Sequence, residues 1–125
     1  ERCTFRENVA WAGGAIHSVM YQSPQALVVA DSTFLENRAT GGNGGAIYND
    51  GNEIVLNVTS SLIENNAANE GGSAIFFVSN NRSGSVIIED STLVDNPSDG
   101  FETSGYPGIF FLGRGAPQVT NSTIG

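Results

Sequence analysis

The acidic side chains are the first candidates for chemistry in this sequence, which carries 13 Asp and Glu residues among its 125. Asp31 and Asp90 take equivalent places in a repeat described below. A second group lies in the longest expected loop: Asp95, Asp99 and Glu102. Glycosidases and polysaccharide lyases need a paired acid and base, or bound Ca²⁺ with a basic residue near the sugar. Thr59 separates Asp31 from Asp90 in the repeat, Lys is absent, and the five Arg are scattered. We therefore expect no catalytic residues.

Cysteine and histidine add little. Cys3 is the only cysteine, so no disulfide can form within the chain, and we expect a small buried side chain there. A catalytic thiol needs a nearby base, and the only histidine, His17, makes no zinc site by itself. Residues 49–53 carry oxygen ligands that Ca²⁺ could use, but Asn-Asp-Gly-Asn is typical of a tight turn. We expect no metal ion and no cofactor.

Three sequences of the type Asn-x-Ser/Thr could accept N-linked glycans, and they begin at Asn57, Asn81 and Asn121. Such sequences also arise by chance in a chain rich in Asn, Ser and Thr. Asn81 lies in a polar loop from which a glycan could project. Asn121 takes the place of Asp31 and Asp90 in the repeat. Asn57 aligns with inward-facing residues, unless a one-residue bulge turns it outward. We hypothesise glycosylation at Asn81 if the source is eukaryotic.

A repeat must position all these residues. An Asn follows three residues after an apolar residue in four places, at intervals of 29, 28 and 31 residues, and a fifth copy starts 31 residues later. The Asn residues are Asn8, Asn37, Asn65 and Asn96. A period of this length marks a solenoid, in which each unit buries its apolar face against its neighbours. We expect the four Asn to stack at one corner as a structural ladder that satisfies backbone groups.

A second motif places an Ile after glycine in every copy: Ile16, Ile47, Ile75 and Ile109, with Ser73 inserted in the third copy. Each copy contains three short apolar runs bounded by Gly, Asn or Asp, which predicts strands rather than helices. Three strands per copy match one triangular coil of a parallel β-helix, right-handed because parallel crossovers are. We predict an all-β fold: a right-handed parallel β-helix of about four coils of 28–31 residues with three short strands each.

Aligning the copies predicts three interior stacks. The first contains Phe5, Phe34, Leu62, Leu93 and Ile124, and the second contains the four Ile of the glycine motif. The third places Leu27 and Val29 over Val55, Val86 and Ile88, with Val119 continuing the row. Residues on the opposite faces of these strands point to solvent, because side chains alternate along a strand.

That alternation directs two apolar rows outward. Tyr48, Phe76 and Phe110 follow the interior Ile residues and predict an exposed column, with His17 at the equivalent place in the first coil. A second stripe is predicted from the residues that follow the first-strand anchors: Leu35, Ile63 and Val94. A contiguous exposed apolar row is an interaction candidate, although long loops such as residues 95–106 could instead cover it.

Composition limits the class of protein. Hydrophobic residues make up 39% and charged residues 14%, and 16 glycines suit a β protein with many turns. A net charge of −8 without Lys argues against nucleic acid as a partner. The apolar runs are too short for a transmembrane segment, and no signal peptide is visible. We expect residues 1–125 to be a single β-helix segment, part of a longer solenoid or assembly whose neighbours cover both ends.

The paired motifs, Phe34-x-x-Asn37 followed by Gly44-Gly45-Ala46-Ile47, resemble the repeats of the chlamydial polymorphic outer-membrane protein family. The resemblance covers nearly the whole chain, and Phe5 to Ile16 is the other copy in which both motifs are intact. Similar repeats occur in surface and secreted proteins of other bacteria, algae and protists. The resemblance implies a right-handed β-helix displayed outside the cell, in adhesion or surface structure.

The sequence is compatible with two functions. The first is a non-enzymatic structural or adhesive module, extracellular or at the cell surface, that presents a rigid β-helix for protein assembly and could belong to a fibre or filament. Its partners would be proteins, including further copies of itself. The second is a carbohydrate-binding or carbohydrate-cleaving β-helix, in which aromatic and carboxylate side chains line a groove.

Overall fold

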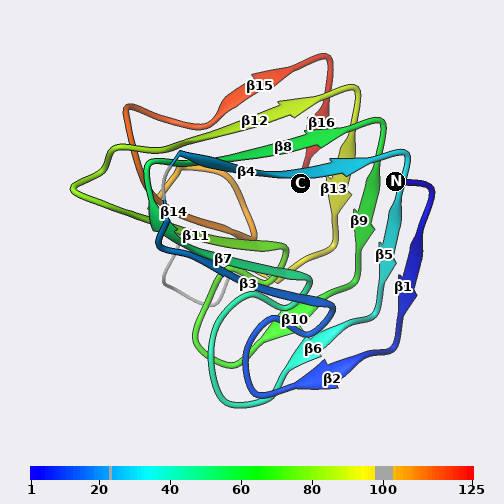
Figure 1. Cartoon of the computed structure of the whole chain (residues 1–125). Coiled ribbons are helices and arrows are strands. Elements are labelled where there is room, and N and C mark those ends of the chain that lie inside the picture. Colours follow the sequence, from blue (N-terminus) through cyan, green and yellow to red (C-terminus); the bar gives the residue numbers. More distant parts are fainter. Residues whose placement is uncertain (23, 98–102) are drawn as a thin grey trace.

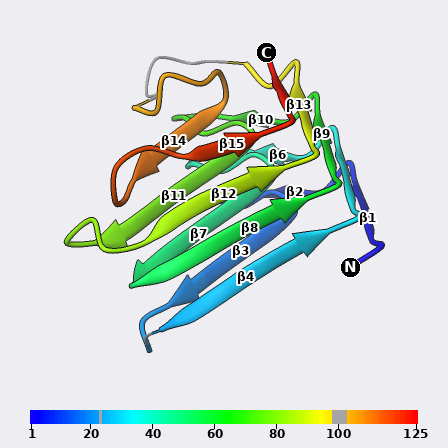
Figure 2. The same ribbon diagram turned by 90° about the horizontal axis from the view of Figure 1, so that it is seen from above.

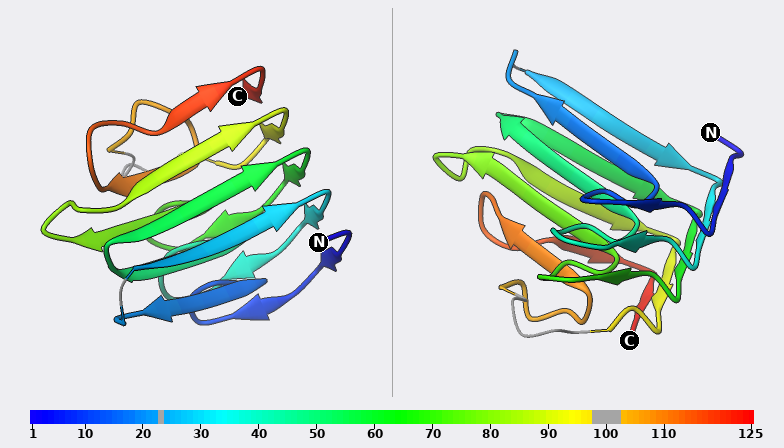
Figure 3. Two further views of the ribbon diagram at one scale, coloured as in Figure 1. Left: turned by 45° about the horizontal axis from the view of Figure 1, so that its top comes forward. Right: turned by 90° about the horizontal axis from the view of Figure 1, so that it is seen from below.

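Short strands joined by tight corners wind the chain into a right-handed parallel β-helix (Figure 1). The computed structural model describes residues 1–22, 24–97 and 103–125. Viewed along the axis in Figure 1, the chain turns clockwise from its N-terminus, and Figure 2 shows that the N-terminal coil is the nearer one. The chain therefore recedes as it turns clockwise, which is a right-handed path. Figure 3 shows the coils stacked from the blue N-terminal end to the red C-terminal end. The predicted fold class is confirmed.

Four parallel sheets run along the axis, each built from one strand per coil. Sheet A contains β1 (Thr4–Arg6), β5 (Thr33–Leu35), β9 (Leu62–Glu64), β13 (Thr92–Val94) and β16 (Thr123–Ile124). Sheet C contains β3 (Ile16–Met20), β7 (Ile47–Asn52), β11 (Ile75–Asn80) and β14 (Ile109–Leu112). Sheet D contains β4 (Gln25–Ala30), β8 (Ile54–Thr59), β12 (Ser85–Glu89) and β15 (Gln118–Thr120). These are the three strands expected in each coil.

Sheet B is a fourth, shorter sheet between sheets A and C. It contains β2 (Val9–Ala10), β6 (Arg38–Ala39) and β10 (Ala67–Ala68). The sequence analysis did not predict it, because strands of only two residues are too short to stand out as apolar runs. Their interior positions are alanines, and Ala39 and Ala68 are buried.

Single residues with positive φ form two of the corners. Between sheets D and A the corner residues are Arg2, Asp31, Ser60, Asp90 and Asn121, with φ from 48° to 52°. Between sheets A and B they are Glu7, Glu36, Asn65 and Asp95, with φ from 55° to 57°. Left-handed backbone is tolerated best by Gly, Asn and Asp. The residue between Asp31 and Asp90 at the first corner is therefore Ser60, and the expectation of Thr59 there was wrong.

The glycine motif serves a third corner, before sheet C. Gly44 has a φ of +73°, and a Cβ on Gly45 would lie 2.3 Å from the carbonyl oxygen of Ser73 in the next coil. The first glycine thus supplies the turn and the second allows close approach of two coils. In the third coil Gly72 has the positive φ, so Ser73 occupies the second glycine position. Ser73 is a substitution in the motif and not the insertion that the sequence suggested.

The first interior stack contains Phe5, Phe34, Ile63, Leu93 and Ile124, paired in register along sheet A. The predicted third member, Leu62, was wrong: it is half-buried on the outer side, whereas Ile63 is 0% exposed. Successive members lie 29, 29, 30 and 31 residues apart. The error arose because Leu62 and Ile63 are both apolar and are followed by two consecutive Asn, so the motif fits in two registers. In the structure it is Ile63 that pairs with Phe34.

The other two stacks show one agreement and one correction. Ile16, Ile47, Ile75 and Ile109 pair in register along sheet C, as predicted. In sheet D, however, Leu56 and Val58 pair with Leu27 and Val29, so Val55 points outward. Asn57 lies between Leu56 and Val58 and therefore also points outward. The strand is paired continuously from Ile54 to Thr59, so this orientation needs no bulge.

Candidate interaction surface

The outer side of sheet C carries a continuous column of four aromatic side chains, one from each strand. The ring centroids of His17 and Tyr48 lie 4.5 Å apart, those of Tyr48 and Phe76 5.0 Å, and those of Phe76 and Phe110 4.7 Å. The interplanar angles are 16°, 10° and 17°. These separations follow from the spacing of neighbouring strands, about 4.8 Å. The column predicted from the sequence is present, and we call it the aromatic column.

Stacking determines which part of each ring is accessible. His17 is exposed, while Tyr48, Phe76 and Phe110 are half-buried. Because each inner ring has a neighbour on both faces, the rings of Tyr48 and Phe76 present their edges to solvent. The column is therefore a flat apolar strip of ring edges, suited to contact with another apolar surface rather than with a ligand that stacks on a ring face.

A second outward row lies beside the column on the same sheet. Val19, Asp50, Val78 and Leu112 are paired in register, and all lie two residues after the members of the column. Val19 is 48% exposed, and the other three are half-buried. These two rows thus combine four aromatic and three aliphatic side chains with one carboxylate. The sequence prediction stopped at the first row, although continuing the alternation by one step would have found the second.

Asp50 is held by two tyrosines from different coils. The hydroxyls of Tyr21 and Tyr48 each donate a hydrogen bond to Oδ2 of Asp50, both at 3.2 Å. The negative charge of Asp50 raises the pKa of the exposed Tyr21 above its usual 10.0, with smaller contributions from burial and the hydrogen bond. The pKa of Tyr48 is also raised, first by burial and then by Asp50. The one carboxylate of these two rows therefore accepts hydrogen bonds from two coils.

A shallow groove of about 240 Å³ borders the column and is lined by Asn43, Glu70, Phe76 and Phe110. Nδ2 of Asn43 donates a hydrogen bond to Oε2 of Glu70 at 3.3 Å. His17 is the N-terminal member of the aromatic column, and its Nδ1 lies 3.2 Å from the carbonyl oxygen of Ala12. Polar groups thus border the apolar strip along the corner that leads into sheet C.

The second predicted stripe, on sheet A, is not continuous. Leu35 and Val94 are half-buried and face outward, but Ile63 is buried in the interior stack, so its assignment as an interface residue was wrong. The residue that pairs with Leu35 and Val94 in the intervening coil is Glu64. A carboxylate between the two aliphatic side chains leaves sheet A a weaker candidate than sheet C.

The asparagine ladder is present, with one correction. Asn8, Asn37 and Asn96 are members, but the third-coil member is Asn66; Asn65 is the exposed corner residue and was wrongly predicted. Each Oδ1 of Asn37, Asn66 and Asn96 accepts the side-chain and the backbone N–H of the preceding member, at 2.9 to 3.0 Å. A parallel ladder joins Cys3, Ser32, Ser61, Ser91 and Ser122, each backbone N–H donating to the next hydroxyl. Cys3 itself is exposed, contrary to expectation.

The three glycosylation candidates all lie on the outside. Asn81 is exposed in the turn between β11 and β12 with a φ of 58°. Asn57 is half-buried on the outer side of sheet D. Asn121 occupies the predicted corner and donates a hydrogen bond from Nδ2 to Oδ1 of Asp90 at 2.6 Å. That bond uses one oxygen of the corner carboxylate.

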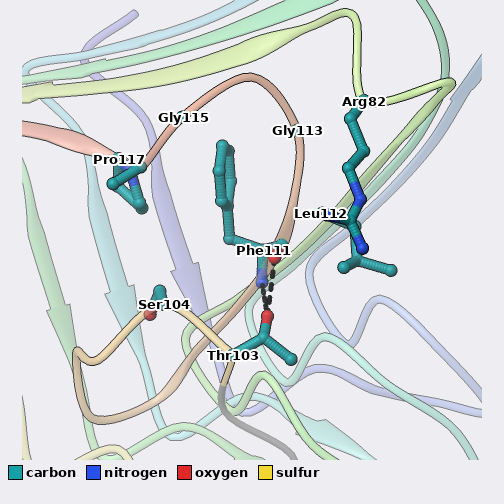
Figure 4. A pocket seen from close by; sticks show the side chains of 9 residues that line it. Arg82, Thr103, Ser104, Phe111, Leu112, Gly113, Gly115 and Pro117 are labelled. Atoms are coloured by element: carbon teal, nitrogen blue, oxygen red, sulfur yellow. Dashed lines mark hydrogen bonds between the residues drawn. The ribbon is translucent and has the colours of Figure 1, made fainter.

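The described part of the chain holds no group of side chains with the composition of a metal site. Across residues 1–22, 24–97 and 103–125, no three His, Cys, Asp or Glu side chains lie together as metal ligands would. Asp99 and Glu102, part of the predicted acidic loop, lie outside the described residues. A cleft of about 280 Å³ near the C-terminal coil is lined mainly by Phe111, Leu112, Pro117 and glycines, with Arg82 at its side (Figure 4). The Thr103 hydroxyl there donates a hydrogen bond to the carbonyl oxygen of Phe111 and accepts one from its backbone N–H.

One copy of the repeat is similar to a repeat of a known family. Residues 31–50 match the Chlamydia polymorphic membrane protein repeat. This segment runs from the corner at Asp31 through both motifs to Asp50, so it spans β5, β6, the glycine corner and the start of β7. Neither the curated proteins nor the solved structures include a match to the chain. In the described part of the molecule, no helix has the length and apolar character needed to cross a membrane.

Proposed function

We propose that this protein is a structural module of the cell surface, displayed outside the cell, whose rigid β-helix presents the outer face of sheet C for assembly with a second copy. The aromatic column carries the proposal. A flat strip of four aromatic and three aliphatic side chains on a regular sheet is a larger exposed apolar feature than isolated side chains provide. The likeness of its repeat to that of outer-membrane surface proteins supports the location.

Face-to-face packing of two sheets is the geometry that such a strip favours. Sheets pack about 10 Å apart with their side chains interdigitated, and sheet C is paired in regular register across its four strands. The net charge of −8 opposes the approach of a second copy. Sheet C contributes little to this repulsion, because Asp50 is the one carboxylate among its paired residues. The proposal involves no catalytic step, and the covered ring faces of the column do not favour stacking of a sugar.

Sedimentation velocity over a range of protein and salt concentrations tests the proposal. We expect reversible self-association that strengthens with salt, because salt screens the repulsion between acidic copies. Phe76→Asp should shift the protein to monomer, since it places a charge at the centre of the face. Leu35→Asp is the matched control, an equally half-buried outward residue on sheet A, and should leave association unchanged. A protein that stays monomeric at high salt, or equal effects of the two variants, would contradict the proposal.

A further inference from the structure

The groove between the glycine corner and the aromatic column combines an apolar wall with a carboxylate. It has a volume of about 240 Å³ and is lined by Asn43, Glu70, Phe76 and Phe110. The first three of these residues belong to the second and third coils, so each has a further coil on either side. Sites for whole small molecules are usually larger, about 300–1,000 Å³. The groove is therefore suited to a single side chain.

The apolar wall of the groove is formed by ring edges. Phe76 is stacked between Tyr48 and Phe110, with ring centroids 5.0 Å and 4.7 Å away. Both faces of the Phe76 ring are thus covered, and its edge is left for contact. Because the hydrogens at a ring edge carry partial positive charge, this wall favours aliphatic groups and does not itself attract a cation. A cation in the groove must therefore be held by another group.

The carboxylate of Glu70 can supply that hold. Glu70 is exposed, and it alone among the four lining residues is ionisable. Its backbone N–H donates to the carbonyl oxygen of Gly42 at 3.1 Å, which joins the loop of the third coil to that of the second. Nδ2 of Asn43 donates to Oε2 of Glu70 at 3.3 Å. That is the one side-chain hydrogen bond of Glu70 within the described residues, so Oε1 is left for a ligand.

We propose that the groove receives a lysine side chain from a partner protein. The methylenes of the lysine lie along the edges of Phe76 and Phe110, and its ammonium donates to Oε1 of Glu70. Arginine fits less well, because a guanidinium stacks on ring faces, which are covered at Phe76, and pairs with both carboxylate oxygens, of which Oε2 already accepts the Asn43 amide. Residues 1–125 contain no lysine, so a second copy of them cannot supply it, and their net charge of −8 attracts a basic partner.

Nuclear magnetic resonance titration with two capped tripeptides, one with lysine and one with norleucine between glycines, tests the proposal. The lysine peptide should cause saturable shifts at the side-chain amide of Asn43 and the ring of Phe76. Glu70→Gln should weaken its binding about threefold, as expected for an exposed ion pair, and should leave binding of the norleucine peptide unchanged. Glu36→Gln is the matched control, because it removes an equally exposed carboxylate at another corner, and should bind the lysine peptide like the unmodified protein.

Low salt suits the titration, because it strengthens the ion pair and keeps the acidic copies apart. A tripeptide with arginine in place of lysine should bind about twofold more weakly. Shifts confined to other surfaces, equal effects of Glu70→Gln and Glu36→Gln, or an arginine peptide that binds as tightly as the lysine peptide would overturn the proposal. A protein that stays monomeric at high salt but binds the lysine peptide as expected would support it, although self-association through sheet C would then be contradicted.

Discussion

Oδ1 of Asn66 accepts both the backbone and the side-chain N–H of Asn37, each at 2.9 Å. Nδ2 of Asn66 in turn donates to Oδ1 of Asn96 at 3.0 Å and to the carbonyl of Phe34 at 3.1 Å. Asn37 and Asn66 are 0% exposed. One buried amide thus satisfies groups from three coils, so the corner of the helix depends on this side chain and not only on backbone pairing.

Replacing Asn66 therefore tests the ladder. Asn66→Ala leaves several buried polar groups without partners, each at a cost of about 1–3 kcal/mol, and we expect the free energy of unfolding to fall by about 3 kcal/mol. Asn65→Gly is the matched control, because Asn65 is exposed and its φ of 57° suits glycine. It should change stability by less than about 0.5 kcal/mol. Urea unfolding measures both, and equal losses would show that Asn66 has no special role.

The second prediction tests the register of the third coil, which places Ile63 inside and Leu62 outside. Ile63→Ala should lower the free energy of unfolding by about 3 kcal/mol, because a fully buried side chain in the sheet A stack is truncated. Leu62→Ala removes a half-buried side chain from the outer side and should cost less than about 1 kcal/mol. Urea unfolding of the pair compares two adjacent aliphatic residues on one strand. A larger loss for Leu62→Ala would mean that the strand is turned by one residue.

Strand β9 also shows how much of the fold can be predicted from the sequence. The solenoid, the number of coils and one complete interior stack, that of the four Ile residues, follow from recurring Phe, Ile and Asn, because a repeated sequence marks each contact several times. The other two stacks were each predicted with one wrong member, Leu62 in sheet A and Val55 in sheet D. The register predicted for the third copy was wrong by one residue, because Leu62-Ile63 and Asn65-Asn66 each offer two residues that fit the motif. A signal that resolves it lies in sheet D: Phe34 follows Val29 by five residues, and Ile63 follows Val58 by the same five. The constant spacing between the sheet D stack and the sheet A stack therefore determines the register of the third copy, which the Asn motif alone does not.

The candidate sites were predicted less completely than the fold. The aromatic column was found because each member follows a repeated Ile. Tyr21 and Glu70 were missed because each occurs in one coil only, and a search for repeated features passes over single residues. Their importance comes from what the neighbouring coil supplies: Asp50 accepts the Tyr21 hydroxyl, and Asn43 donates to the Glu70 carboxylate. Such contacts between non-equivalent residues require the three-dimensional register.

A third prediction concerns Asn49, which faces the interior of sheet C between Ser18 and Phe77. It is 0% exposed, and neither Oδ1 nor Nδ2 has a hydrogen-bond partner within the described residues. Removing an unpaired buried amide relieves a desolvation cost, so Asn49→Val should raise the free energy of unfolding by about 1–3 kcal/mol. Asn37→Val, at a fully bonded amide, should lower it. Urea unfolding distinguishes the two, and a loss of stability in Asn49→Val would refute the assignment.

The fourth prediction concerns the pKa values of the two tyrosines bonded to Asp50 and the stability of the fold in alkaline solution. The pKa values of Tyr21 and Tyr48 are raised above 10.0 in the folded protein, so the unfolded chain ionises its tyrosines first as pH rises. The stabilisation is therefore complete below pH 10 and is lost as pH rises through the folded-state pKa values. Ultraviolet titration of phenolate absorbance, with Tyr21→Phe to assign the two residues, measures the shifts.

Asp50→Asn should lower both pKa values, because it removes the negative charge beside the phenols. The pKa of Tyr21 should return closer to 10.0, since Asp50 is the first cause of its shift, whereas burial should keep that of Tyr48 raised. Added salt should reduce the shift at the exposed Tyr21 more than at Tyr48. An unchanged titration curve in Asp50→Asn would mean that the carboxylate does not join the two coils through the phenols of Tyr21 and Tyr48.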